Sequence, residues 1–170
     1  TDSNGKFWYG KCKFYGNGEK YNPTSAYSMF LEASQEGIIG AKYYQALCLL
    51  NGIGADRDDK SAFEIFKSLY EENSYLPALH QMALCYYYGR GTEFNYNEAF
   101  QAFKKATESN YFLSELYYVS LLQGSERKAA GKQLREHFEK NASKDSEAQF
   151  EYGKYLKYIN RNKAIKLIKL

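Results

Sequence analysis

The sequence predicts an all-α fold, a solenoid in which helical hairpins stack one after another, and three observations support this prediction. The stretch "ALCLLNGIGADRDDKSAFEIFKSLYEEN" (46–73) returns in altered form as "ALCYYYGRGTEFNYNEAFQAFKKATESN" (83–110), a shift of 37 residues. A further copy lies 36 residues upstream, so the repeat has a fixed period. Only two prolines occur in 170 residues, and paired glycines follow the apolar runs as they do at helix ends.

Each repeat is predicted to contain two helices. In the unit at 41–73, an apolar run at helical spacing stops at Gly52, because a glycine just past a helix adopts the left-handed conformation without steric cost. Asp58 or Asp59 can cap the second helix. The second helix then carries an amphipathic stripe of Ala62, Phe63, Phe66, Leu69 and Tyr70.

Other repeated positions indicate how the hairpins turn and pack. A column of small residues allows two helices to cross closely: Gly10, Ala46, Ala83, Val119 and Gly153. Pro23 and Pro77 fall near helix starts, where a missing N–H costs little. Gly37, Asn73 and Asn110 stand where the second helix must turn back. One hairpin cannot bury its apolar face alone, so neighbouring units must stack.

The repeat covers nearly the whole chain as one predicted domain of about 4.5 hairpins. The units are 5–37, 41–73, 78–110, 114–141 and 148–170. The loop near Gly124 is shorter and has lost its second glycine, and the last unit stops half-way. Because the first residue is not Met, we expect the 170 residues to be a segment of a longer protein.

The columns "A-x-Y-x-x-A-x-C-L-L-x-G-x-G" and "D-x-x-x-A-F-x-x-F-x-x-L" resemble the Sel1-like repeat, a hairpin related to the tetratricopeptide repeat. This resemblance implies an α/α right-handed superhelix. It also implies a scaffold or adaptor rather than an enzyme, since the family is associated with endoplasmic-reticulum-associated degradation, chitin-synthase activation and bacterial interactions with hosts. The short loop near Gly124 and the 18 tyrosines depart from the family pattern.

The residue types that usually carry chemistry are better explained by packing. Cys12, Cys48 and Cys85 occupy one slot in successive units, so they cannot all pair and are expected to be small core residues. His80 shares a column with Phe7 and Tyr43, which indicates an aromatic packing slot. The sequence therefore predicts no catalytic, metal-binding or cofactor-binding residues.

His137 lies 57 residues from His80, and neither histidine has ligands at metal-binding spacing. The motifs "GNG", "GIG" and "GRG" follow helices and lack the Lys-Ser/Thr of a phosphate loop, so we interpret them as helix caps. No nucleophile, base and orienting group occur together, which argues against an enzyme.

The overall charge and hydropathy limit the classes of partner that the chain is expected to bind. A net charge of +3 gives no support to nucleic-acid binding, and no apolar run approaches the length of a membrane span. The cysteine pattern favours a reducing compartment such as the cytoplasm over the endoplasmic reticulum lumen or secretion. The expected partner is another protein or a peptide.

Two functions remain open from the sequence. The favoured one is a non-catalytic scaffold that binds a peptide or helix through its concave face. The alternative is a regulatory repeat domain of a larger enzyme or membrane-enzyme complex, such as an activator or a degradation-complex subunit.

The first helix of each hairpin is expected to line the concave side, and aromatic groups with a polar tip are common interface anchors. The alternative is that these rings pack against neighbouring first helices. The predicted partner-binding residues are Trp8, Lys11, Tyr15, Tyr44, Gln81, Tyr88, Tyr117 and Lys154.

Overall fold

The computed structural model describes residues 2–141, and all regular structure in that range is helical, as the sequence predicts. The helices are α1 (Ser3–Tyr15), α2 (Pro23–Gln35), α3 (Ile39–Asn51), α4 (Asp59–Asn73), α5 (Leu76–Tyr88), α6 (Tyr96–Glu108), α7 (Phe112–Leu121) and α8 (Gly124–Asn141). The helix pairs α1 with α2 and α3 with α4 form the expected hairpins in residues 2–99, and α7 packs against α8 in the second unit. The predicted unit at 148–170, with Gly153 and Lys154, lies outside the described residues.

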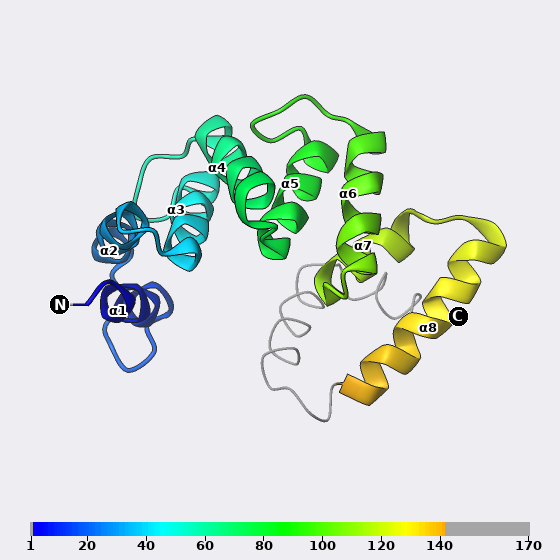
Figure 1. Ribbon diagram of the computed structural model, residues 1–170, viewed down its shortest axis with the longest axis horizontal. Coiled ribbons are helices and arrows are strands. Elements are labelled where there is room, and N and C mark those ends of the chain that lie inside the picture. The colour runs from blue at the N-terminus through cyan, green and yellow to red at the C-terminus, as the bar shows by residue number, and fades with distance from the viewer. Residues whose placement is uncertain (1, 142–170) are drawn as a thin grey trace. The chain divides into compact units, whose positions relative to one another are not determined.

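The chain divides between Ala99 and Phe100 into two compact units. The first unit holds α1 to α5 and the start of α6. Within it each helix packs against the next one along the chain, from α1 against α2 to α4 against α5 (Figure 1). This is the arrangement of a helical solenoid, in which each hairpin completes the core of its neighbour.

The small-residue column lies where helices cross, which confirms its predicted role. Ala46 and Ala83 are fully buried. At Gly10 a methyl group would lie 2.9 Å from the ring of Phe30 on α2, closer than real carbon contacts allow. Phe30 is itself fully buried against Ala26 and Cys48, so the glycine lets α1 approach an aromatic core.

The helix ends follow the predicted signals, with one shift in register. Gly52 and Gly89 are left-handed caps, each with φ of 64°, and Asp58 rather than Asp59 caps α4 by accepting from the Ser61 amide. Helix α4 ends at Asn73, as predicted, but the left-handed residue is Ser74, one position later. Ser74 stands two residues before the next helix, as the left-handed Gly37 and Asn110 do.

The second glycine of each pair is not a helix cap, contrary to the prediction. A methyl group on Gly54 would lie 2.1 Å from the Pro23 carbonyl oxygen, and one on Gly91 would lie 2.0 Å from the Asp59 carbonyl oxygen. Both contacts reach the start of the second helix in the preceding hairpin. These glycines therefore let consecutive hairpins come into backbone contact.

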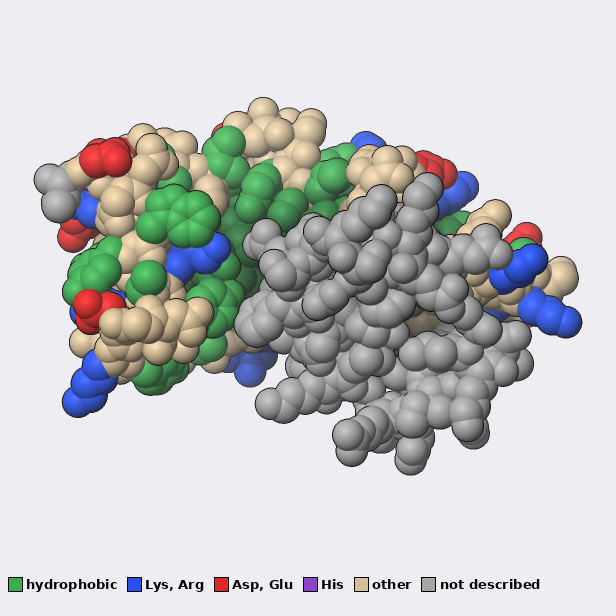
Figure 2. All heavy atoms as spheres, turned by 90° about the horizontal axis from the view of Figure 1, so that it is seen from below, with side chains coloured by type: hydrophobic (Ala, Val, Ile, Leu, Met, Phe, Trp, Pro, Cys, Tyr) green, Lys and Arg blue, Asp and Glu red, His purple; other side chains and the backbone are tan. Residues whose placement is uncertain are grey.

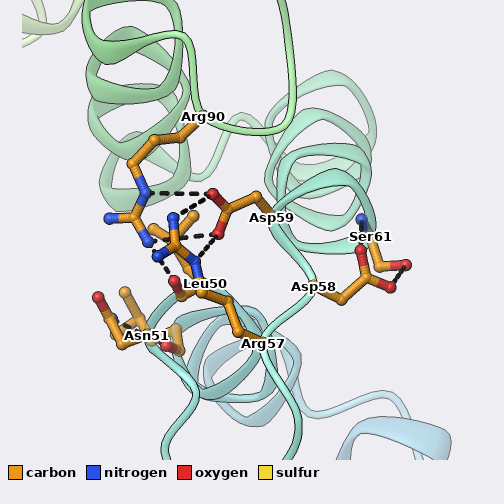
Figure 3. Close-up of polar contacts among 8 residues, drawn as sticks. Leu50, Asn51, Arg57, Asp58, Asp59, Ser61 and Arg90 are labelled. Atoms are coloured by element: carbon orange, nitrogen blue, oxygen red, sulfur yellow. Dashed lines mark hydrogen bonds and ion pairs between the residues drawn. The ribbon is translucent and has the colours of Figure 1, made fainter.

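Arg90, between the two glycines of the third hairpin, adds a polar contact to this junction (Figure 3). Its guanidinium donates to the Leu50 carbonyl at the end of α3 and pairs with Asp59 at 3.3 Å. Arg57 donates to the same carboxylate at 2.6 and 2.8 Å. Hydrogen bonding from Arg57 and the nearby charge of Arg90 lower the pKa of Asp59 to about 2.

The second unit has its own small core. The ring of Tyr117 on α7 stacks on the buried Phe103 of α6, with 5.1 Å between ring centroids. Val119, the small-column residue of this hairpin, is buried. Helix α7 ends at Leu121 and α8 begins at Gly124, so the loop between them is short, as the sequence indicates.

Candidate partner-binding face

The first helices of the first unit, α1, α3 and α5, form what we call the first-helix face. Six of the eight predicted residues belong to it: Trp8, Lys11 and Tyr15 on α1, Tyr44 on α3, and Gln81 and Tyr88 on α5. Tyr117 belongs to the second unit, where it packs in the core, and Lys154 lies outside the described residues. Figure 2 shows hydrophobic side chains gathered over the N-terminal helices, with basic side chains among them.

Four of the predicted residues meet where α1 lies against α3. The ammonium group of Lys11 lies over the ring of Trp8, 4.5 Å from its centroid, and 5.4 Å from the centroid of Tyr44. The hydroxyl oxygens of Tyr15 and Tyr44 are 3.0 Å apart, within hydrogen-bond distance. These four residues therefore form one side-chain cluster in the structure.

Tyr44 is also a packing residue. Its half-buried ring lies 5.1 Å from Phe30, 5.7 Å from Phe14 and 5.8 Å from Phe7, measured between centroids. Phe7 in turn fills the space above Gly40 of α3, where a methyl group would be 2.8 Å from the ring. For Tyr44 the structure favours packing between first helices, the alternative that the sequence left open.

Trp8 and Tyr88 are more exposed than Tyr15 and Tyr44, the other predicted aromatic residues of this face. Trp8 is 59% exposed and Tyr88 is 52% exposed. Tyr88 is steadied by an edge contact with Tyr87, with 5.0 Å between centroids. Gln81 instead links first helices, since its amide donates to the Tyr43 hydroxyl across 3.4 Å.

The lysines of α1 sit in different electrostatic surroundings. Lys6 pairs with Glu32 at 3.0 Å, and a hydrogen bond to that carboxylate raises the pKa of Lys6. Lys13 pairs with Glu19 at 3.6 Å. A hydrogen bond to Tyr9 is the main cause that raises the pKa of Lys13.

His80, Cys48 and Cys85 are buried and uncharged. Burial lowers the pKa of His80 to about 3, so the imidazole is neutral at physiological pH. Burial also raises the pKa of Cys48 and of Cys85 to about 12, which keeps both thiols protonated. These three residues are packing residues, as predicted from their columns. Cys12 is half-buried.

Among the side chains that the structure describes, those of residues 2–111 and 113–134, no three His, Cys, Asp or Glu gather as a metal ion would require. Along residues 2–141 no helix combines the length and the apolar character needed to cross a membrane.

The sequence analysis missed a second set of exposed aromatics. Tyr21 is 58% exposed and Phe94 is 66% exposed, and both lie in the loops that join the two helices of a hairpin. Each stands five residues after the first glycine of its pair, and Arg57 holds the equivalent position in the second hairpin. Comparison of loop columns, rather than of helix columns alone, would have found them.

Comparison with known proteins agrees with this architecture. A family model described as Sel1 repeat matches residues 3–38, 40–74, 76–111 and 146–170. A search of curated proteins found no match.

Two solved structures resemble the chain. One is a Sel1 repeat protein from Oxalobacter formigenes, 23% identical, with a TM-score of 0.59, covering 69% of this chain and 47% of that one. The other is a protective antigen present in uropathogenic Escherichia coli strains, which displays an SLR fold. It is 21% identical, with a TM-score of 0.69, covering 91% of this chain and 33% of that one. The chain therefore spans less than half the length of either.

Proposed function

The chain belongs to the Sel1 repeat family, and from this premise we propose that it is a non-catalytic scaffold that binds a peptide or helix of another protein. Sel1 repeats are typically protein-interaction repeats. The binding surface in this proposal is the first-helix face, which the sequence predicts to be concave. The proposal concerns these 170 residues, and any activity of a longer parent is separate from it.

The observation that carries the proposal is the exposure of large aromatic side chains on first helices. Trp8 and Tyr88 each leave more than half of their surface in solvent. Rigid aromatic side chains lose little conformational entropy on binding, which makes them frequent hot spots of interfaces. Gln81 and Lys11 lie on the same helices and offer polar contacts that would orient a partner.

The test uses peptides selected from a random display library on the chain. Trp8 is the only tryptophan, so its fluorescence reports directly on the first-helix face. A selected peptide should shift the emission of Trp8. The double change Trp8→Ala with Tyr88→Ala, measured by titration calorimetry because it removes the fluorescent residue, should weaken peptide binding by about 2–4 kcal/mol and leave the helical circular dichroism spectrum unchanged.

The matched control is Tyr21→Ala with Phe94→Ala, which removes two rings of similar exposure from the loops. These loop changes should leave peptide affinity unchanged. If the loop pair abolishes binding while the first-helix pair does not, the first-helix face is not the binding site. Tyr44 is unsuitable for this test because its truncation would open the core around Phe30.

A further inference from the structure

The acidic residues of the helices in the first unit lie on the second helices and not on the first ones. Helices α1, α3 and α5 contain no aspartate or glutamate in their sequences. They carry four lysines instead: Lys6, Lys11, Lys13 and Lys42. The second helices hold the acids, among them Glu32 on α2 and Asp59, Glu64, Glu71 and Glu72 on α4. The first-helix face is therefore built from segments without negative charge.

Lys11 differs from the other two lysines of α1. Lys6 and Lys13 each have a carboxylate partner, at 3.0 and 3.6 Å. Lys11 has none among the carboxylates described in the first unit, residues 2–99, and its ammonium group is held over the rings of Phe7 and Trp8. An aromatic face attracts a cation through its quadrupole but does not neutralise it. The rings thus fix the position of Lys11, and within residues 2–99 no carboxylate compensates its positive charge.

The surface beside this charge is apolar. The Trp8 ring that supports Lys11 is more than half exposed, so a ligand that reaches the ammonium group also meets an open indole. A carboxylate would form a charge-assisted hydrogen bond with the ammonium group. An adjoining apolar side chain would cover the indole.

We propose that this part of the first-helix face receives an acidic peptide segment. An aspartate or glutamate of the peptide pairs with Lys11, and a neighbouring apolar or aromatic residue packs on Trp8. This inference rests on the proposed function and specifies the chemistry of its partner. A nucleic acid fits less well, because phosphate backbones are bound by several free cations in a row, and Lys6 and Lys13 are already paired.

The experiment selects peptides from a random display library on the wild-type chain and on Lys11→Met in parallel. Wild type should enrich peptides with acidic residues next to apolar ones, and Lys11→Met should lose the acidic preference while it keeps the apolar one. A synthetic peptide from the wild-type pool should bind about tenfold more weakly when its glutamates become glutamines. Lys11→Met should weaken the glutamate peptide to the same extent, and added salt should reduce the difference.

Two control variants test whether the effect of Lys11→Met comes from the lost charge or from a change in the structure of α1. Lys11→Arg keeps the charge over the rings and should keep the acidic preference. Lys13→Met removes a lysine of the same helix that lies 4.7 Å from the Tyr9 ring centroid and is already paired with Glu19. It should leave both the preference and the affinity unchanged.

The outcomes separate this inference from the function on which it rests. In one outcome, selected peptides shift Trp8 emission and yet show no enrichment of acidic residues, or show an enrichment that persists in Lys11→Met. Either result overturns the inference of an acidic partner and leaves the proposed scaffold function standing. Bound peptides that leave Trp8 emission unchanged, or the absence of any selected peptide, overturn both.

Discussion

The change Gly91→Ala tests whether Gly91, like Gly54, joins consecutive hairpins by backbone contact. The added methyl carbon would lie 2.0 Å from the Asp59 carbonyl oxygen, 2.5 Å from the carbonyl carbon and 3.0 Å from the Phe63 side chain. Because the nearest atoms are backbone, no side chain can rotate away. The loop and the start of α4 must therefore separate.

The magnitude follows from two contributions. Gly91 has φ of +72°, and placing an L-residue in this conformation costs about 1 kcal/mol. Forcing a packed junction apart costs a further ~2–3 kcal/mol. We therefore expect Gly91→Ala to lower the free energy of unfolding by about 3–4 kcal/mol.

Gly18→Ala is the matched control, because Gly18 has the same φ of +72° but no atom within 4 Å of the added methyl group. It should lose only the conformational contribution, about 1 kcal/mol. Gly54→Ala, with a contact of 2.1 Å to the Pro23 carbonyl oxygen, should resemble Gly91→Ala. The assay is urea unfolding followed by far-ultraviolet circular dichroism. If Gly91→Ala and Gly18→Ala lower the free energy of unfolding equally, the backbone contact between Gly91 and the start of α4 is refuted.

Three further predictions concern charge and burial. Arg90→Met should lower the free energy of unfolding by about 1–2 kcal/mol near neutral pH. The pKa of Asp59 falls from its ordinary 3.8 to about 2 on folding, so its stabilising contribution is complete above pH ~4 and is lost as pH falls toward 2. Urea unfolding of both proteins across this pH range measures the contribution. If the free energies of unfolding of wild type and Arg90→Met still differ by the same amount below pH ~2, the ion pair is contradicted. Burial lowers the pKa of His80 from 6.5 to about 3, so unfolded chains bind the extra proton and stability declines as pH falls from 6.5 toward 3. Between pH ~7 and ~5 the free energy of unfolding of His80→Phe should fall by about 1–2 kcal/mol less than that of wild type. An equal fall in the two proteins would contradict a buried neutral imidazole. Under native conditions a thiol reagent should label Cys12 and spare Cys48 and Cys85, whose pKa values are about 12, until the chain unfolds; rapid labelling of all three would contradict their burial.

The local features of the fold were predictable from the sequence because their causes are local. The left-handed caps at Gly52 and Gly89 and the cap at Asp58 depend on residues within one turn of the helix end. The small-residue column was predictable because repetition turns a packing requirement into a visible pattern. Ser74 was missed because serine rarely adopts a left-handed conformation, so Asn73 beside it gave the stronger signal.

The contacts between hairpins were not predictable in the same way. Gly91 and Asp59 are 32 residues apart, and nothing near either residue indicates that their backbones touch. The orientation of Tyr44 depends on how closely α1 approaches α3, which Gly40 and Phe7 determine together. Helical spacing placed Trp8, Lys11 and Tyr44 in one cluster, but it could not tell an exposed ring from one that packs between helices.

Gly18 has a practical consequence for protein engineering. It already has the left-handed backbone that Gly54 and Gly91 use, and the space beside it is open where theirs is filled by a helix start. A designed hairpin, copied from residues 41–73 and fused ahead of α1, could therefore be seated against this loop without any change to α1. In such an elongated array, Gly18→Ala should become as costly as Gly91→Ala is in the present chain, so a single substitution would report whether the graft had docked.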